Sequence, residues 1–186
     1  MQGVVEVYEA DIVFANRYLV DRGLVPMTQW SVTGNMIAYG AHVPVVEAEK
    51  IESVGKTMEI SQALAVDIET YNPDGKLLDM EKYAIVMIAL YAPDFEKVLT
   101  WKPVEGDNVE VLNGEESMLR RFAELLQEYT PDVLLGYNSD GFDLPYIATR
   151  AKKYDIELKL GRDYSQMDIK GTRDKKVSIP GIAHVD

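Results

Sequence analysis

Two acidic residues at strand spacing are the first candidates for chemistry in this sequence. Asp67 and Glu69 stand two positions apart in the apolar segment 63–70, so a strand there would place both carboxylates on one face. Two like charges this close repel each other, and a buried carboxylate needs a partner. A divalent cation would meet both requirements, and carboxylate oxygens suit magnesium or manganese. The alternative is that this end of the strand reaches solvent and that both acids are simply hydrated.

A third acid, Asp143, follows a second apolar segment at 132–137. Loops at the strand ends of open α/β sheets lie over the binding crevice, so Asp143 could meet the acidic pair on a neighbouring strand. We therefore expect Asp143 to lie within metal-bridging reach of Asp67. The alternative is a helix cap formed by Asp143 or Asp140, with Pro145 in a first turn that needs no N–H.

The elements around these acids alternate between strands and helices. Apolar patterns predict strands at 63–70 and 132–137, a hairpin over 83–91 and 97–101, and amphipathic helices at 117–129 and 142–154. This order predicts the α/β class, with a mixed sheet and helices packed on it.

The chain on either side of this pattern is less regular. The first part predicts a short strand at 4–8, a helix at 12–22 capped by Asp11, a hairpin or two within 28–50, and a polar connector at 47–59. The last part predicts short strands at 157–160, 177–179 and 182–185, separated by the charged stretch 163–176. Neither part contains an internal repeat or a low-complexity segment.

The composition excludes several classes of protein. With 19 basic and 31 acidic residues the net charge is −12, which argues against tight binding of duplex nucleic acid. An acidic pocket could still meet a nucleic acid through bound cations. The absence of Cys excludes disulfides, thiolate zinc sites and cysteine nucleophiles. No apolar run approaches about eighteen residues, so no membrane partner is expected.

Two short segments resemble the exonuclease motifs of family B DNA polymerases. The run 67–70, Asp-Ile-Glu-Thr, resembles the first motif, and Tyr137-Asn138 with Phe142-Asp143 resembles the second. In the second motif Ser139 stands where many relatives have Gly, while the span from the Asn to the Asp is preserved. Further segments resemble sequence signatures of archaeal members of the family. They are 7–12, 14–19, 21–24, 100–102, 131–133, 160–163 and 184–186.

This resemblance implies an RNase H-like fold and a division into two parts. Residues 1–60 would be the end of the polymerase N-terminal domain, a small β-rich and helical segment. Residues 61–186 would be most of the 3′→5′ exonuclease domain, truncated before the third motif, Tyr-x-x-x-Asp. Tyr164 and Asp168 have that spacing, but they lie in a charged loop and we treat the match as coincidence. The chain alone is therefore expected to degrade DNA weakly or not at all.

The activity that the resemblance implies is proofreading, in which two Mg²⁺ or Mn²⁺ ions hydrolyse the 3′-terminal phosphodiester of single-stranded DNA. The catalytic and metal-binding residues would be Asp67, Glu69 and Asp143. The DNA-binding residues would be Thr70, Asn138 and Phe142, with an aromatic ring near the strand end. Phe142 could equally be a core residue, and Asn138 could equally satisfy backbone groups of its loop.

The partners implied are a single-stranded DNA 3′ end, the other polymerase domains and a sliding clamp that binds through regions outside this chain. The location implied is the cytoplasm, with the nucleoid. Two other functions stay open. One is a stand-alone exonuclease of the same fold acting on RNA or oligonucleotides, which would not need residues 1–60. The other is a polymerase module that keeps the acids but does not turn over.

Overall fold

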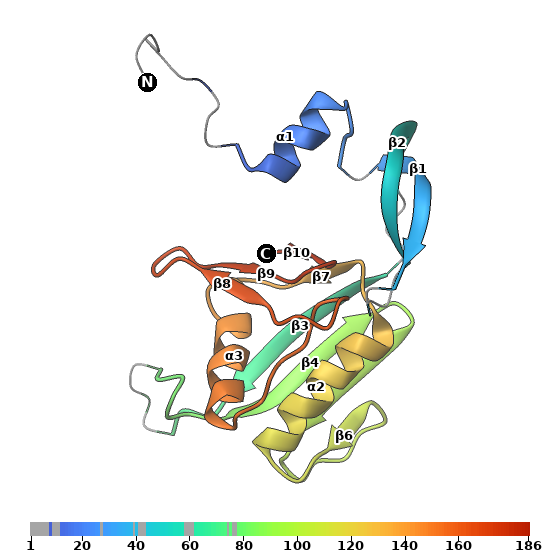
Figure 1. The fold of residues 1–186 in the computed structure, drawn as a ribbon. Coiled ribbons are helices and arrows are strands. Elements are labelled where there is room, and N and C mark those ends of the chain that lie inside the picture. Colours follow the sequence, from blue (N-terminus) through green and yellow to red (C-terminus); the bar gives the residue numbers. More distant parts are fainter. Residues whose placement is uncertain are drawn as a thin grey trace. The chain divides into compact units, whose positions relative to one another are not determined.

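The computed structural model describes residues 8, 12–26, 28–38, 40, 44–57, 62–73, 75 and 78–186. The chain forms two compact units (Figure 1). The first comprises Met1–Ala38 and Pro44–Glu59, and the second comprises Tyr39–Val43 and Ile60–Asp186. The predicted assignment of 1–60 to a polymerase N-terminal domain stays a prediction. The strand predicted at 4–8 and the cap predicted at Asp11 fall outside the described residues, apart from Tyr8.

In the residues that the structure describes, the first unit contains one helix and one hairpin. Helix α1 spans Phe14–Asp21, and strands β1 (Thr28–Ile37) and β2 (Val45–Thr57) pair antiparallel. The connector predicted at 47–59 is therefore wrong over most of its length. Backbone pairing with β1 extends to the end of β2, and the described side chains of β2 are largely exposed, so polar residues fit this strand.

The second unit is built on a six-stranded mixed sheet with the order β10-β7-β3-β4-β5-β6. Its strands are β3 (Ala63–Thr70), β4 (Ile85–Ala92), β5 (Phe95–Thr100), β6 (Val109–Val111), β7 (Val133–Leu135) and β10 (Ala183–Val185). The β3–β4 and β4–β5 pairs are antiparallel, and the β3–β7, β7–β10 and β5–β6 pairs are parallel. The predicted α/β class with a mixed sheet is confirmed.

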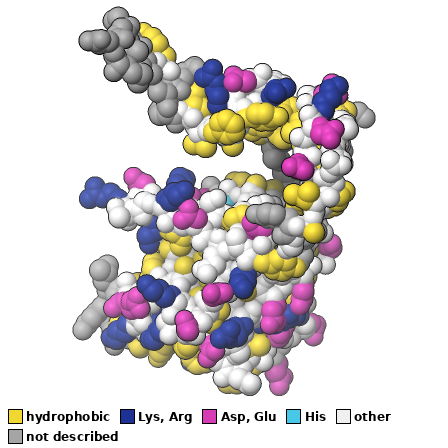
Figure 2. Space-filling view, viewed as in Figure 1, with side chains coloured by type: hydrophobic (Ala, Val, Ile, Leu, Met, Phe, Trp, Pro, Cys, Tyr) yellow, Lys and Arg dark blue, Asp and Glu magenta, His cyan; other side chains and the backbone are white. Residues whose placement is uncertain are grey.

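Two helices pack against this sheet. Helix α2 (Glu115–Tyr129) contacts β4, β5 and helix α3 (Asp143–Lys153) (Figure 1). The apolar face predicted for α2 is buried, with Met118, Leu119 and Phe122 fully inaccessible to solvent. This core takes one face of β3, because Leu64, Val66 and Ile68 are all buried. Figure 2 shows acidic and basic side chains interspersed over the outer surface of α2.

The last part of the chain adds a second hairpin and the edge strand β10. Strands β8 (Asp168–Lys170) and β9 (Lys176–Ser178) pair antiparallel, whereas the strand predicted at 157–160 does not form. Strand β8 lies inside the stretch predicted to be only a charged separator. None of the described helices is long and apolar enough to cross a membrane.

Candidate active site

Strand β3 presents Asp67 and Glu69 on the face opposite the core. Both are exposed, while Ile68 between them is 5% exposed, which confirms the predicted alternation. Their partners across the β3–β4 pair are Ala89 and Met87, so neither acid has a charged group directly opposite on β4. Because this face is open, the expected cost of burying the two carboxylates does not apply to them. The case for a cation depends instead on the third acid.

Asp143 is the first residue of α3 and is 2% exposed. Strand β7 pairs with β3 only as far as Ala65, so the N–H of Ile68 has no partner from β7. The Oδ1 atom of Asp143 accepts a hydrogen bond from that N–H at 3.1 Å. The start of α3 is thereby fixed near the end of β3, between Asp67 and Glu69.

The electrostatics of Asp143 link it to its acidic neighbours. Burial raises the pKa of the Asp143 carboxyl, and the Ile68 N–H opposes this only in part. The negative charges of Asp67 and Asp186 raise that pKa further. The hydrogen bond to Ile68 thus places Asp143 beside the acidic strand, whereas the metal-bridging reach between Asp67 and Asp143 stays a prediction. The interaction of Asp186 was not predicted; its only signal in the sequence was the family-like run 184–186.

These residues fit a divalent cation by their chemistry. A buried carboxylate that faces a second carboxylate is stabilised by positive charge, and hard cations prefer oxygen ligands. The side chains do not converge as a finished site, however. Within the part of the chain that the structure describes, no group of three or more acidic or His side chains could hold a metal ion. The assignment of Asp67, Glu69 and Asp143 as joint ligands stays a prediction.

The loop from β7 to α3 carries two of the predicted DNA contacts. Asn138 is exposed and has a left-handed backbone, with φ of 56°, and its carbonyl accepts the N–H groups of Gly141 and Phe142. Phe142 is partly buried, and its ring lies 5.4 Å from that of Tyr146 in an edge-on arrangement. Phe142 thus packs on the core, as the alternative for this residue expected. Thr70, the third predicted contact, ends β3 and is partly exposed.

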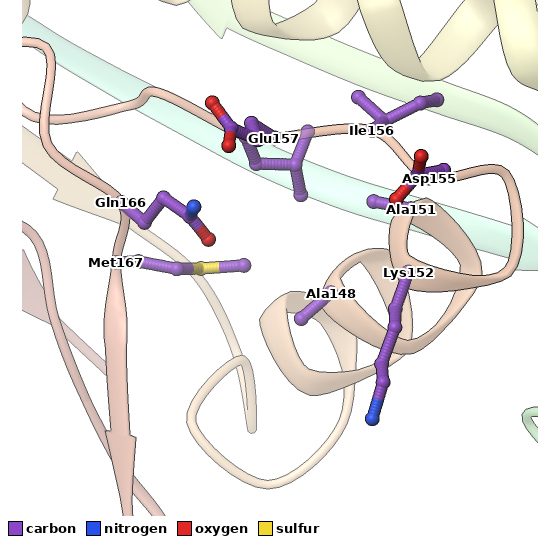
Figure 3. A pocket seen from close by; sticks show the side chains of 9 residues that line it. Ala148, Ala151, Lys152, Asp155, Ile156, Glu157, Gln166 and Met167 are labelled. Atoms are coloured by element: carbon purple, nitrogen blue, oxygen red, sulfur yellow. The ribbon is translucent and has the colours of Figure 1, made fainter.

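A hollow at the other end of α3 is separate from the acids. It has a volume of about 320 Å³ and is lined by Ala148, Ala151, Lys152, Asp155, Ile156, Glu157, Leu158, Gln166 and Met167 (Figure 3). None of these was predicted as a site residue, and the 11-residue helix spans roughly 15 Å between its ends. Two carboxylates against a single Lys make it a poor site for a phosphate backbone. We do not include this hollow in the site.

Comparisons with known proteins agree with this architecture. The model of the DNA polymerase family B exonuclease domain matches residues 5–186. The chain is 37% identical over 185 residues to a DNA polymerase of Methanocaldococcus jannaschii, covering 98% of this chain and 10% of that protein. It is 38% identical over 184 residues to a DNA polymerase of Pyrococcus glycovorans, covering 98% of this chain and 20% of that protein.

A solved structure shows the same fold. The family B DNA polymerase of the hyperthermophilic archaeon Pyrobaculum calidifontis superposes with a TM-score of 0.78 at 33% identity, over 99% of this chain and 23% of that one. The chain thus spans no more than about a fifth of the two curated relatives. The match of family model, sequence and fold over nearly every residue shows that this chain belongs to the exonuclease-domain family of the family B DNA polymerases.

Proposed function

We propose that this chain is the proofreading region of a DNA polymerase, which removes the 3′-terminal nucleotide of single-stranded DNA. The observation that carries the proposal is that the buried Asp143 carboxylate accepts the N–H of Ile68, the residue between Asp67 and Glu69, at 3.1 Å. The raised pKa of Asp143 supports it, because a bound cation would relieve the charge that raises it.

Asp67, Glu69 and Asp143 would hold two divalent ions, magnesium or manganese. When bound, such ions lower the pKa of water and stabilise the charge that develops on a leaving oxygen. The protein's own contribution is to hold the acidic side chains in position. The Ile68 N–H holds the Asp143 carboxylate at 3.1 Å, and Asp67, the residue before Ile68, is exposed.

The loop before α3 would hold the end of the DNA strand. Asn138 is exposed at the point where the loop turns, and Phe142, four residues later, is only partly buried. Thr70 lies at the end of β3, next to Glu69, and could bond the terminal nucleotide. A net charge of −12 gives the chain little attraction for DNA, so we expect other polymerase domains to supply most of the affinity.

The test is the rate at which a full-length polymerase carrying this sequence degrades a labelled single strand. Asp67→Asn should lower that rate about 100-fold or more, since metal ions contribute several kcal/mol to such reactions. Nucleotide incorporation should stay largely intact, because synthesis belongs to another domain. Glu96→Gln is the matched control, since Glu96 is exposed on β5 and shares the face of Asp67.

Two outcomes would replace the proposal. Equal rates in the wild type and the Asp67 variant would show that Asp67 does not serve this reaction. Absence of degradation in both would favour the non-catalytic polymerase module, for which the lack of a converged ligand group among the described residues is the supporting observation. Running an RNA strand of the same sequence in parallel tests the stand-alone ribonuclease alternative.

A further inference from the structure

A buried polar network holds the loop that precedes α3, and the proposed function does not use it. We call Ser139, Asp140 and His184 the Ser139 network. Ser139 is fully buried, Asp140 is 7% exposed, and the His184 side chain is 4% exposed. Ser139 and Asp140 directly follow the predicted DNA contact Asn138 in the sequence, and His184 lies more than 40 residues later in β10.

The side chains of this network tie the loop to two strands. The Asp140 carboxylate accepts the N–H of Val177 in β9 at 2.6 Å and lies 3.2 Å from Nδ1 of His184. The other ring nitrogen of His184, Nε2, lies 2.8 Å from Oγ of Ser139. Burial would raise the pKa of Asp140, but the Val177 N–H and the neighbouring Lys176 and His184 lower it below its ordinary value. The buried carboxylate is thus fully partnered.

Backbone contacts carry this connection into the helix. The carbonyl of Ser139 accepts the N–H of Leu144, the residue after Asp143, at 3.1 Å. The N–H of Gly136, where the loop begins, donates to the carbonyl of Val185 at 3.1 Å. A Cβ at Gly136 would lie 2.2 Å from Oγ of Ser139, so the loop packs against the network too closely for any side chain there. The position of the loop is thus set by β9 and β10.

The contacts from Asp140 to His184 and from His184 to Ser139 resemble those of a hydrolytic triad, but the burial of Ser139 does not suit a nucleophile. A nucleophile must reach its substrate, whereas Ser139 has no exposed surface. Its hydroxyl also lies 3.0 Å from Oδ1 of Asp186, which competes for the same proton. These groups therefore act on the structure around them and not on a substrate.

We infer that Ser139, Asp140 and His184 are positioning residues for the exonuclease reaction, because they hold Asn138 and Asp143 in place beside the end of β3. This inference rests on the proposed function. A displacement of about 1 Å in a group that holds reacting atoms can lower a rate about 100-fold. The loop is fixed to the acidic strand by Asp143, and this network fixes it to the edge strand β10 and to β9.

The matched control is a hydroxyl near the other end of α3. Ser139→Ala removes one buried hydroxyl from the network, and Tyr154→Phe removes one that donates to Glu115 at 2.8 Å. The two changes should lower Tm by similar amounts, since each removes one hydrogen-bonded hydroxyl. Only Ser139→Ala should lower kcat for single-strand degradation, by about 10- to 100-fold, with KM for DNA changed little.

His184 tests the same inference by rescue. His184→Ala should lower kcat as far as Ser139→Ala or further, while His184→Gln should recover much of the loss, because its amide can reach Ser139 as Nε2 does. If His184→Ala does not fold, Ser139→Ala still carries the test. Activity is measured in the full-length polymerase. Hydrogen exchange of the Gly141, Phe142 and Leu144 amides is measured in this chain and should accelerate in the network variants alone.

The outcomes separate this inference from the proposed function. If Asp67→Asn abolishes degradation while Ser139→Ala and His184→Ala match Tyr154→Phe in kcat and in amide exchange, the positioning role is wrong and the function stands. If the wild type does not degrade DNA, the proposed function fails. Unchanged amide exchange in the network variants would then overturn the structural half of the inference as well.

Discussion

Two buried polar networks hold α3, and they differ in what they attach it to. The Ser139 network ties the loop before the helix to the short strands β9 and β10. The second, which we call the Glu115 network, comprises Glu115, Arg150 and Tyr154 and joins α3 to the start of α2. It also reaches β4, because the N–H of Ile85 donates to Glu115 at 2.8 Å.

The Glu115 network joins α2, α3 and β4 and also reaches the turn before β4. Arg150 makes a two-pronged ion pair with Glu115, at 2.6 and 2.8 Å, and its remaining nitrogen donates to the carbonyls of Met80 and Glu81. These hydrogen bonds to Glu115 hold the pKa of Arg150 above its ordinary value, although burial opposes this. No atom of this network is shared with the acidic site. We therefore expect the Glu115 network to contribute mainly to stability, and the Ser139 network mainly to the position of Asn138 and Asp143.

The largest effect should come from breaking the Glu115 network. Arg150→Met leaves the Glu115 carboxylate buried without its charge partner, and we expect a loss of about 3–5 kcal/mol in the free energy of unfolding. Urea denaturation measures this. The control is Arg120→Met, which removes an exposed ion pair with Glu116 on α2 and should cost under about 1 kcal/mol. Similar losses in both variants would contradict the role given to Glu115.

A smaller loss, dependent on pH, should follow from changing the Ser139 network. Asp140→Asn weakens hydrogen bonds to a carboxylate, each worth about 1.5–3 kcal/mol. Because the pKa of Asp140 is lowered by folding, its contribution is present above the ordinary pKa of an Asp and is lost as pH falls through the lowered value. The difference between wild type and variant should therefore shrink in acid. A difference that does not depend on pH would contradict the charged partnership of Asp140.

The sequence predicts the strands and helices around this site better than the side-chain networks that connect them. Alternation placed Asp67 on one face of β3, and helical periodicity placed Phe122 in the core, because both depend on neighbours within one element. The second half of β2 was missed because strand pairing outweighed a polar composition. The network around Ser139 was missed for a different reason. Its members come from separate segments and leave no periodic signal.

The open face of β3 was one of two alternatives that the sequence could not separate. An apolar strand predicts at least one covered face, but it does not say whether the second is covered, so the sequence left burial and exposure of Asp67 and Glu69 open; the structure shows exposure. Asp143, by contrast, is the buried acid, and the sequence could not separate that from a helix cap. It is both the first residue of α3 and the partner of Ile68.

The smallest effect should come from a network on the surface. Arg121 of α2 pairs with Glu110 at 3.0 Å and with Glu128 at 2.9 Å, and its side chain is 25% exposed. Arg121→Gln should cost under about 1 kcal/mol and less still in about 1 M salt, where exposed charges are screened. Unfolding by urea at low and high salt measures this. A loss as large as that of Arg150→Met would remove the distinction between buried and exposed networks.

The central claim is that Asp67 and Asp143 share a metal ion. Manganese broadens the amide signals of nearby residues in a nuclear magnetic resonance spectrum, so a titration of this chain locates the ion even when it binds weakly. We expect broadening to begin at Ile68, Glu69 and Asp143, and to require about tenfold more manganese in the Asp67→Asn variant. Broadening that begins elsewhere, for example at the acidic residues Glu124 and Glu128 of α2, and that the variant leaves unchanged would contradict the claim.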